Sequence, residues 1–351
     1  MSTLNENKIT IGVINWDCSL PSDTFFGFHA TKSLSPSKYR YATPYYADII
    51  SENKIDYHIR SQEEYDRELQ YAIECGIDYF AYCWYGESKK QEHADGKWWH
   101  VNMHELSYGR RMHANSTLRE KIKMCAILGV GANLNELNDE EFVSLANEMK
   151  QDYYQKIDGR PLLYVYRGYN EPLIDKVNDV CKECGTPKPY VSFMCAWDYN
   201  PDIEDFTKAD AVSAYSHVVP DVPSYDEFTD AFWERHEYRK RFAINIIPHF
   251  SLGYDPSPRI DNPVPWHGYE DYRYNNYASE EEVLRGAKKL VDWVNKNKEL
   301  CPTGHILTFA WNEFEEGAWI CPTYNKDGTR VDTSRTKAFE KAVNMWKKHM
   351  K

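Results

Sequence analysis

Two glutamates that follow a short apolar run are the residues in this sequence best suited to chemistry. They lie within HILTFAWNEFEEGAWICP, from His305 to Pro322. Glu313 and Glu316 are flanked by aromatic residues, and two carboxylates in such surroundings can act as a general acid and a general base. The alternative is a solvated acidic turn that opens the next loop, and for an isolated pair of glutamates this alternative is favoured. The elements that position the pair have to decide between the two interpretations.

Apolar segments of strand length recur along the chain and alternate with helical patterns. The segment just before Glu313 is one of them, because residues 306–310 are apolar and rich in β-forming types. Pro248 predicts that the seventh segment is irregular near its end. The eight predicted strands are 9–16, 77–85, 123–129, 161–167, 190–197, 211–216, 243–250 and 306–310.

Helix start signals separate several of these strands. Ser61, Asn138 and Ser279 each stand at the start of an amphipathic pattern, and Ser61 and Ser279 have a glutamate three residues further on, as in a capping box. A closing helix is expected around residues 338–346. Residues 86–122 are polar with little periodicity, so we expect a long loop after the second strand, and another after the seventh.

This alternation is typical of a (β/α)8 barrel, and no composition break divides residues 1–351, so we predict a single catalytic (β/α)8 TIM barrel domain. A doubly wound open sheet is the alternative, but no glycine-rich phosphate loop follows the first strand. In a barrel the carboxyl ends of the strands share one face, so residues there border one cavity. The predicted substrate-binding residues are Trp16, Asp17, Trp84, Tyr85, Trp197, His217, His249, Arg259, Trp311 and Asn312, with Arg167 and Asp198 as further neighbours.

Charge and composition exclude several classes of partner. A net charge of −12 with a pI near 5.5 argues against nucleic acid or an anionic membrane surface, since both require a basic face. The sequence contains no apolar run long enough to span a membrane, and the polar start of the chain is not a signal peptide. Nine scattered cysteines indicate free thiols in a reducing compartment, so we expect a cytoplasmic protein.

Other catalytic chemistries have less support. No GxSxG elbow or Walker-type loop is present, and Cys18 is the only attractive cysteine nucleophile but lacks a local partner. A metal-dependent hydrolase would draw on His217, His249 and Asp17 or Asp198, without any diagnostic spacing. The pair His100 and His104 has i, i+4 spacing but no third ligand. We therefore expect no metal and no other cofactor.

A carboxylate pair among aromatic residues in an acidic barrel best suits glycosyl transfer to water, with an oligosaccharide or polysaccharide as substrate. One carboxyl group would protonate the leaving oxygen while the other acts as base or nucleophile. The sequence spacing does not give the stereochemical outcome.

Four motifs resemble those of a known family. WNEFEEG at Trp311–Gly317 resembles the WNEWxEG signature of the WbsX-like proteins, which are related to the endo-α-mannosidases of glycoside hydrolase family 99. The other three, in the same order as in the family, are IDYFAYCWY at 77–85, DGRPLLYVY at 158–166 and GYDPSPR at 253–259.

The resemblance implies a (β/α)8 barrel that cleaves an α-linked, mannoside-like glycan without a metal. Glu313 matches the base that deprotonates the sugar 2-hydroxyl, which then attacks its own anomeric carbon. Glu316 matches the acid and base toward the leaving group and water, so the route is retaining and substrate-assisted. Tyr254 would help at the sugar hydroxyls, and Trp84 and Tyr85 would line the subsite.

The sequence departs from the family pattern at several positions. Phe314 and Glu315 replace the more usual residues inside the signature, and Cys321 stands before Pro322 where an acidic residue is common. These departures place any difference in substrate at the subsite beyond the cleaved bond. Two alternatives remain, a non-catalytic glycan-binding barrel and a glycosyltransferase of polysaccharide synthesis, although no nucleotide-sugar Rossmann pattern is present.

Overall fold

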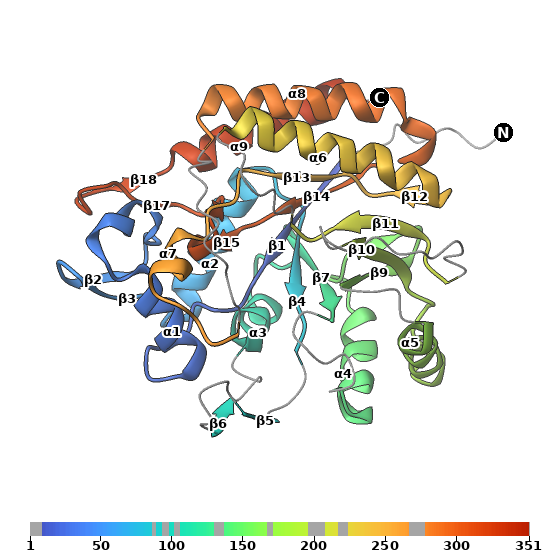
Figure 1. Cartoon of the computed structure of the whole chain (residues 1–351). Coiled ribbons are helices and arrows are strands. Elements are labelled where there is room, and N and C mark those ends of the chain that lie inside the picture. Colours follow the sequence, from blue (N-terminus) through green and yellow to red (C-terminus); the bar gives the residue numbers. More distant parts are fainter. Residues whose placement is uncertain are drawn as a thin grey trace.

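Parallel strands form the centre of the protein, as a computed structural model of the chain shows (Figure 1). The structure describes residues 9–85, 89–92, 98–101, 106–129, 137–166, 171–195, 208–216, 224–266 and 278–350. The central strands are β1 (Thr10–Asn15), β4 (Tyr79–Cys83), β7 (Lys123–Leu128), β9 (Arg160–Tyr166), β10 (Tyr190–Cys195), β11 (Ala211–Ala214), β12 (Asn245–Ile246), β13 (His249–Ser251) and β14 (His305–Phe309). Each predicted strand overlaps one of them, or two in the case of residues 243–250.

The seventh strand is split into β12 and β13, and this split closes the barrel. The strand order is β12-β11-β10-β9-β7-β4-β1-β14-β13, so the two halves of one strand stand at opposite ends of the sheet. The backbone N–H of Ile247 donates to Val212 on one side, and the carbonyl of Pro248 accepts from Leu307 on the other. Pro248 has no N–H to give to a ladder, so the irregularity lies in the middle of the strand, not at its end. Eight strand positions thus form the predicted (β/α)8 fold.

Large aromatic side chains fill the barrel interior. Gly12 on β1 leaves room for the ring of Tyr79, since a Cβ there would lie 2.1 Å from the Tyr79 Cζ atom. The Tyr79 hydroxyl pairs with that of Tyr164 at 2.8 Å, so these two interior hydroxyls are satisfied. The interior is a packed core, as is usual for this fold.

Amphipathic helices cover the barrel, and their start signals are those of the sequence. Asn138 and Ser279 form complete capping boxes, whereas Ser61 accepts from the Glu64 N–H but the Glu64 carboxylate accepts from Arg60. Helices α6, α8 and α9 lie along one side of the sheet, and α4 and α5 lie together on another (Figure 1). The covering helices are α2 (Gln62–Glu74), α4 (Asp139–Met149), α5 (Glu171–Glu183), α6 (Tyr225–Arg239), α8 (Glu280–Lys296) and α9 (Ser334–His349).

The connection after the second barrel strand is more ordered than its polar sequence predicted. It contains a hairpin and helix α3, so the expectation of an irregular loop over residues 86–122 was wrong in part. The sequence of α3 contains Gly109 and is mostly polar, so it shows no clear helical pattern of apolar residues. The further elements are α1 (Phe25–Leu34), η1 (Ser37–Ala42), β2 (Asp48–Ser51), β3 (Lys54–Asp56), β5 (Lys89–Glu92), β6 (Trp98–Val101), α3 (Tyr108–Asn115), β8 (Lys156–Ile157), η4 (Lys240–Phe242), α7 (Ser257–Asp261), η5 (Lys298–Leu300), β15 (Asn312–Glu313), η6 (Phe314–Glu316), β16 (Ala318–Trp319), β17 (Thr323–Tyr324) and β18 (Val331–Asp332).

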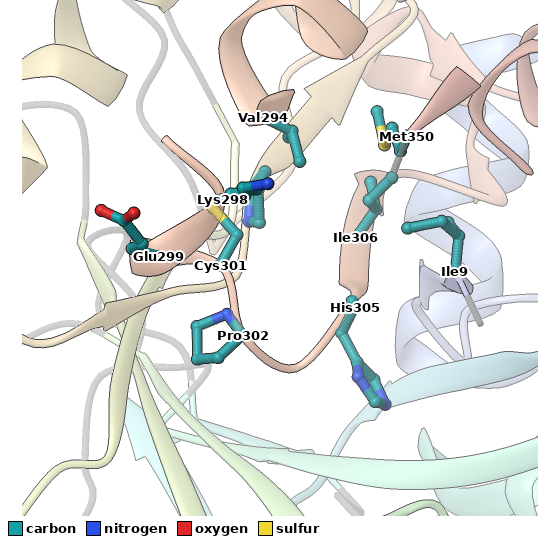
Figure 2. Close-up of a pocket in the computed structure, with 11 residues that line it drawn as sticks. Ile9, Val294, Lys298, Glu299, Cys301, Pro302, His305, Ile306 and Met350 are labelled. Atoms are coloured by element: carbon teal, nitrogen blue, oxygen red, sulfur yellow. The ribbon is translucent and has the colours of Figure 1, made fainter. Parts of the chain in front are cut away.

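A cavity of about 200 Å³ lies at the amino-terminal ends of β1 and β14 (Figure 2). Ile9, which precedes β1, and His305, which begins β14, both line it. The active sites of enzymes with this fold lie at the opposite, carboxyl ends of the strands. Within the described residues, no helix is long and apolar enough to cross a membrane.

Candidate active site

The signature segment folds into a tight hairpin just beyond the end of β14. Strands β15 and β16 pair antiparallel, with Asn312 opposite Trp319 and Glu313 opposite Ala318. The turn between them is the 3-10 helix η6, followed by Gly317 in the left-handed conformation. Three of the four positions from 313 to 316 carry buried carboxylates: Glu313, Glu315 and Glu316.

Gly317 is required where the hairpin meets the loop after β13. Its φ is +72°, and a Cβ there would lie 2.5 Å from the backbone N of Asp255, which donates to the Glu316 carbonyl at 2.7 Å. Gly317→Ala is therefore expected to lower the free energy of unfolding by roughly 1–3 kcal/mol in urea titrations. Gly159→Ala is the matched control, because Gly159 has φ +78° but open space around it. Equal losses in both variants would contradict a role for the close contact.

Arg259 joins the three carboxylates. It lies on α7, which packs against η6 (Figure 1). Its Nη2 atom lies 3.0 Å from Glu315 Oε2 and 3.5 Å from Glu313 Oε2, and its Nη1 atom donates to Glu316 Oε1. Arg259 is only 3% exposed. A buried guanidinium of this kind holds several carboxylates in fixed geometry through its rigid fork of donors.

Glu313 is the carboxyl group whose protonation is most altered by the fold. Burial raises its pKa well above the ordinary value of 4.5, and the negative charges of Glu316 and Glu315 raise it further. Arg259 and a hydrogen bond from the Tyr215 hydroxyl, 3.3 Å from Glu313 Oε1, act in the opposite direction. The surroundings of Glu313 therefore favour its protonated form more than those of an ordinary glutamate do.

Glu315, one of the residues at which the sequence departs from the family pattern, is fully buried. Its Oε1 atom accepts a hydrogen bond from the Tyr57 hydroxyl at 3.1 Å while Oε2 faces Arg259. Glu315 is thus a buried counter-ion of Arg259. The same guanidinium also contacts Glu313 through Nη2 and Glu316 through Nη1.

Asn312 fixes Trp16 beside this cluster. Its Oδ1 accepts from the Trp16 N–H at 2.9 Å and its Nδ2 donates to the Trp16 carbonyl at 2.7 Å. The Trp16 ring centroid lies 5.1 Å from the Arg259 guanidinium carbon and 5.8 Å from the Trp266 ring centroid. Burial raises the pKa of the Tyr85 phenol, the charges of Cys83 and Glu313 raise it further, and a hydrogen bond with Trp16 lowers it.

Three other predicted binding residues have partners elsewhere in the fold. The Trp311 indole is buried and donates to Glu68 Oε1 on α2 at 2.6 Å. The Trp84 ring is covered by Arg110 of α3, whose guanidinium carbon lies 3.4 Å from the ring centroid. His249 is buried, with Nε2 2.9 Å from the Tyr215 carbonyl oxygen.

Two further predicted residues lie outside the hairpin. Asp17 accepts from the Arg110 N–H at 2.9 Å, and Tyr254 is buried in the loop after β13. Trp197, His217, Arg167, Asp198 and His104 lie outside the described residues, as does the side chain of His100. Sugar binding by all these residues stays a prediction.

Two residues of the cluster carried no signal in the sequence. Tyr57 lies after the β2–β3 hairpin, where neither spacing nor motif marks it, and Tyr215 lies near the end of the sixth predicted strand, 211–216. Both reach the glutamates from more than 95 residues away in the chain. A tyrosine at a strand end is a weak signal, since this sequence contains 27 tyrosines.

The described residues bear on two of the competing chemistries. No group of three His, Cys, Asp or Glu side chains among them could hold a metal ion. Burial and the charges of Glu315 and Glu313 raise the pKa of the Cys18 thiol well above its ordinary value, which disfavours the thiolate that nucleophilic catalysis needs. All nine cysteines are free, as the sequence predicted.

The barrel and its carboxylate-rich end define an α/β protein of the (β/α)8 class. The fold is shared with the GH99 endo-α-mannosidase from Bacteroides thetaiotaomicron in complex with Bis-Tris propane, at a TM-score of 0.57 and 13% identity over 97% of this chain and 98% of that chain. A second structure of that enzyme gives a TM-score of 0.52 at 14% identity over 88% and 85% of the two chains. No protein-family model matches the sequence. No curated protein matches it either.

Proposed function

We propose that this protein is a retaining α-glycosidase similar to the family 99 endo-α-mannosidases and the WbsX-like proteins. The observation that carries the proposal is the buried hairpin at the carboxyl end of β14, on which Glu313 and Glu316 both contact Arg259. Buried carboxyl groups of unequal environment are what glycosyl transfer requires. The shared barrel fold supports the proposal without carrying it.

Glu313 is the base in this mechanism. It removes the proton of the sugar 2-hydroxyl as that oxygen attacks the anomeric carbon, and its raised pKa makes it a stronger base than an ordinary glutamate. Glu316 protonates the leaving oxygen as the glycosidic bond breaks, and then takes a proton from the water that attacks the anomeric carbon. This attack breaks the bond between that carbon and the 2-oxygen, which regains its proton from Glu313, and the original configuration is restored. The substrate is an α-linked, mannoside-like oligosaccharide, and Trp16 offers an aromatic face beside the carboxylates.

The test is product analysis on a panel of α-linked glycans. Proton NMR of the first product formed is expected to show the α-anomer, which then equilibrates. The β-anomer as first product would overturn the retaining route. Tight sugar binding without turnover would instead favour a glycan-binding barrel, and transfer from a nucleotide sugar without hydrolysis would favour a glycosyltransferase.

The pH dependence of kcat/KM provides a separate prediction for Glu313. Because the base must be ionised, activity is expected to fall as the pH drops through its pKa, and this acidic limb should lie well above pH 4.5. In Glu315→Gln the limb should move to lower pH, since one of the charges that raise the pKa of Glu313 is removed. A limb that stays in place in Glu315→Gln, or an acidic limb at or below pH 4.5 in the parent, would contradict this assignment.

A further inference from the structure

A small cavity lies inside the protein, behind the hairpin that carries the glutamates. Asn15 and Asp17 at the end of β1, Glu68 on α2 and Asn312 on β15 are among the residues that line it. Its volume is about 10 Å³. That is about the space that one water molecule needs.

Two polar atoms of this lining have no hydrogen-bond partner among the described residues. They are Asn15 Nδ2 and Glu68 Oε2, on side chains that are 2% and 1% exposed. The other end of each group is fixed, because Asn15 Oδ1 accepts from Asn312 and Glu68 Oε1 accepts from the Trp311 indole. Buried polar groups are nearly always paired, so two unpaired ends at one water-sized cavity indicate a bound water molecule.

We propose that Glu68 is a positioning residue that, together with Asp17 and one water molecule bound in this cavity, holds the Trp311–Asn312 segment behind Glu313. The donors and acceptors balance when Glu68 is protonated at Oε2. That hydroxyl and Asn15 Nδ2 donate to the water oxygen, and the water donates to the carboxylate of Asp17.

The electrostatic environments of Glu68 and Asp17 agree with this arrangement. Burial raises the pKa of Glu68 to about 8, the indole of Trp311 lowers it, and the charge of Asp17 raises it. Burial raises the pKa of Asp17 to about 7, and the N–H and charge of Arg110 lower it. Two neighbouring carboxyl groups of this kind retain a proton at neutral pH.

The other ionisable groups around the pair do not titrate in the same range. Burial raises the pKa of every tyrosine and cysteine that faces it, so these groups stay neutral. Those facing Glu68 are Tyr45, Tyr46, Tyr65, Tyr82 and Cys321. The ionisable groups that face Asp17 are Tyr65, Tyr82, Cys83, Arg110 and Arg111.

Thermal unfolding between pH 5 and pH 8 tests the protonated state without any activity measurement. A carboxyl group whose pKa is raised on folding stabilises below its unfolded pKa, and this stability is lost as the pH rises toward the folded value. The Tm of the parent is therefore expected to fall with pH, and Glu68→Gln should remove a part of that fall on the order of 5 °C. Glu63→Gln is the matched control, since the Glu63 side chain on the same helix is 88% exposed. The same fall in all three proteins would overturn the proposal.

The indole N–H signal of Trp311, identified by its loss in Trp311→Phe, reports the positioning directly. It is expected to move as the pH passes about 8 in the parent and to be independent of pH in Glu68→Gln. A high-resolution crystal structure of the full chain should show one water between Asn15 and Glu68. A pH-independent signal in the parent, or a cavity without that water, would overturn the proposal.

The effect on turnover rests on the proposed function. Glu68→Leu, which cannot accept from the indole, is expected to lower kcat more than it raises KM, and Glu68→Gln should recover most of the lost kcat. If the parent itself has no glycosidase activity, the proposed function fails while the unfolding and NMR tests still decide the role of Glu68. If Glu68→Leu does not fold, the Glu68→Gln measurements remain sufficient.

Discussion

Glu316→Gln is expected to lower kcat on an unactivated α-glycoside by roughly 10²–10⁴-fold, because the leaving oxygen loses its proton donor. The same variant should regain the first chemical step on an α-glycosyl fluoride, since fluoride leaves without protonation. Glu313→Gln should show a similar loss without this recovery, because the 2-hydroxyl lacks its base whatever the leaving group. Initial rates on the two substrate types, measured for both variants, separate the two roles.

A matched control for these variants lies at the other end of the barrel. Glu299 borders the cavity at the amino-terminal ends of the strands, so Glu299→Gln removes one carboxylate without touching the hairpin (Figure 2). Its kcat should equal that of the parent. Circular dichroism and unfolding curves should confirm that Glu313→Gln and Glu316→Gln are folded. Full activity of both folded variants on the unactivated substrate would remove the glutamates from the mechanism.

The barrel was predictable from the sequence because its strands are buried on both faces and therefore read as near-continuous apolar runs. The capping residues Asn138 and Ser279 also act locally, so their patterns are visible in a few consecutive positions. Helix α3 was missed because it is polar, has no side-chain cap and contains Gly109, which packs against Asp17. That contact is tertiary, and no local pattern encodes it.

The candidate site was predictable only in part, for the same reason. Glu313, Glu316 and Arg259 stand in segments whose motifs mark them, and the structure brings them into contact. The sequence does not indicate that Glu68 accepts a hydrogen bond from the Trp311 indole, 243 residues away in the chain. An aromatic residue at a strand end can face a sugar or the core, and the Trp311 indole donates to Glu68 on α2. The parts of the site that depend on such long-range pairs are those that the sequence left open.

Arg259→Met is expected to destabilise the protein by roughly 3–5 kcal/mol, because it leaves a cluster of buried carboxylates without their counter-ion. The loss should be larger at pH 8 than at pH 5. Arg259 lowers the pKa of Glu313, so without it that group takes up a proton more readily, and keeping it protonated in the folded state costs more as the pH rises. Urea unfolding at the two pH values measures both effects.

The control for Arg259→Met is an arginine with similar chemistry in a different environment. Arg285→Met breaks an ion pair in which Arg285 Nη2 lies 2.8 Å from Asp226 Oδ2. The Arg285 side chain is 51% exposed. Solvent screens this pair, so little change in stability is expected at either pH. Arg259→Lys should fall between parent and Arg259→Met, since a lysine keeps the charge but cannot bridge Glu315 and Glu316 with one rigid fork. Comparable losses in Arg259→Met and Arg285→Met, or a larger loss at pH 5, would show that Arg259 does not hold the carboxylates in the way that the contacts indicate.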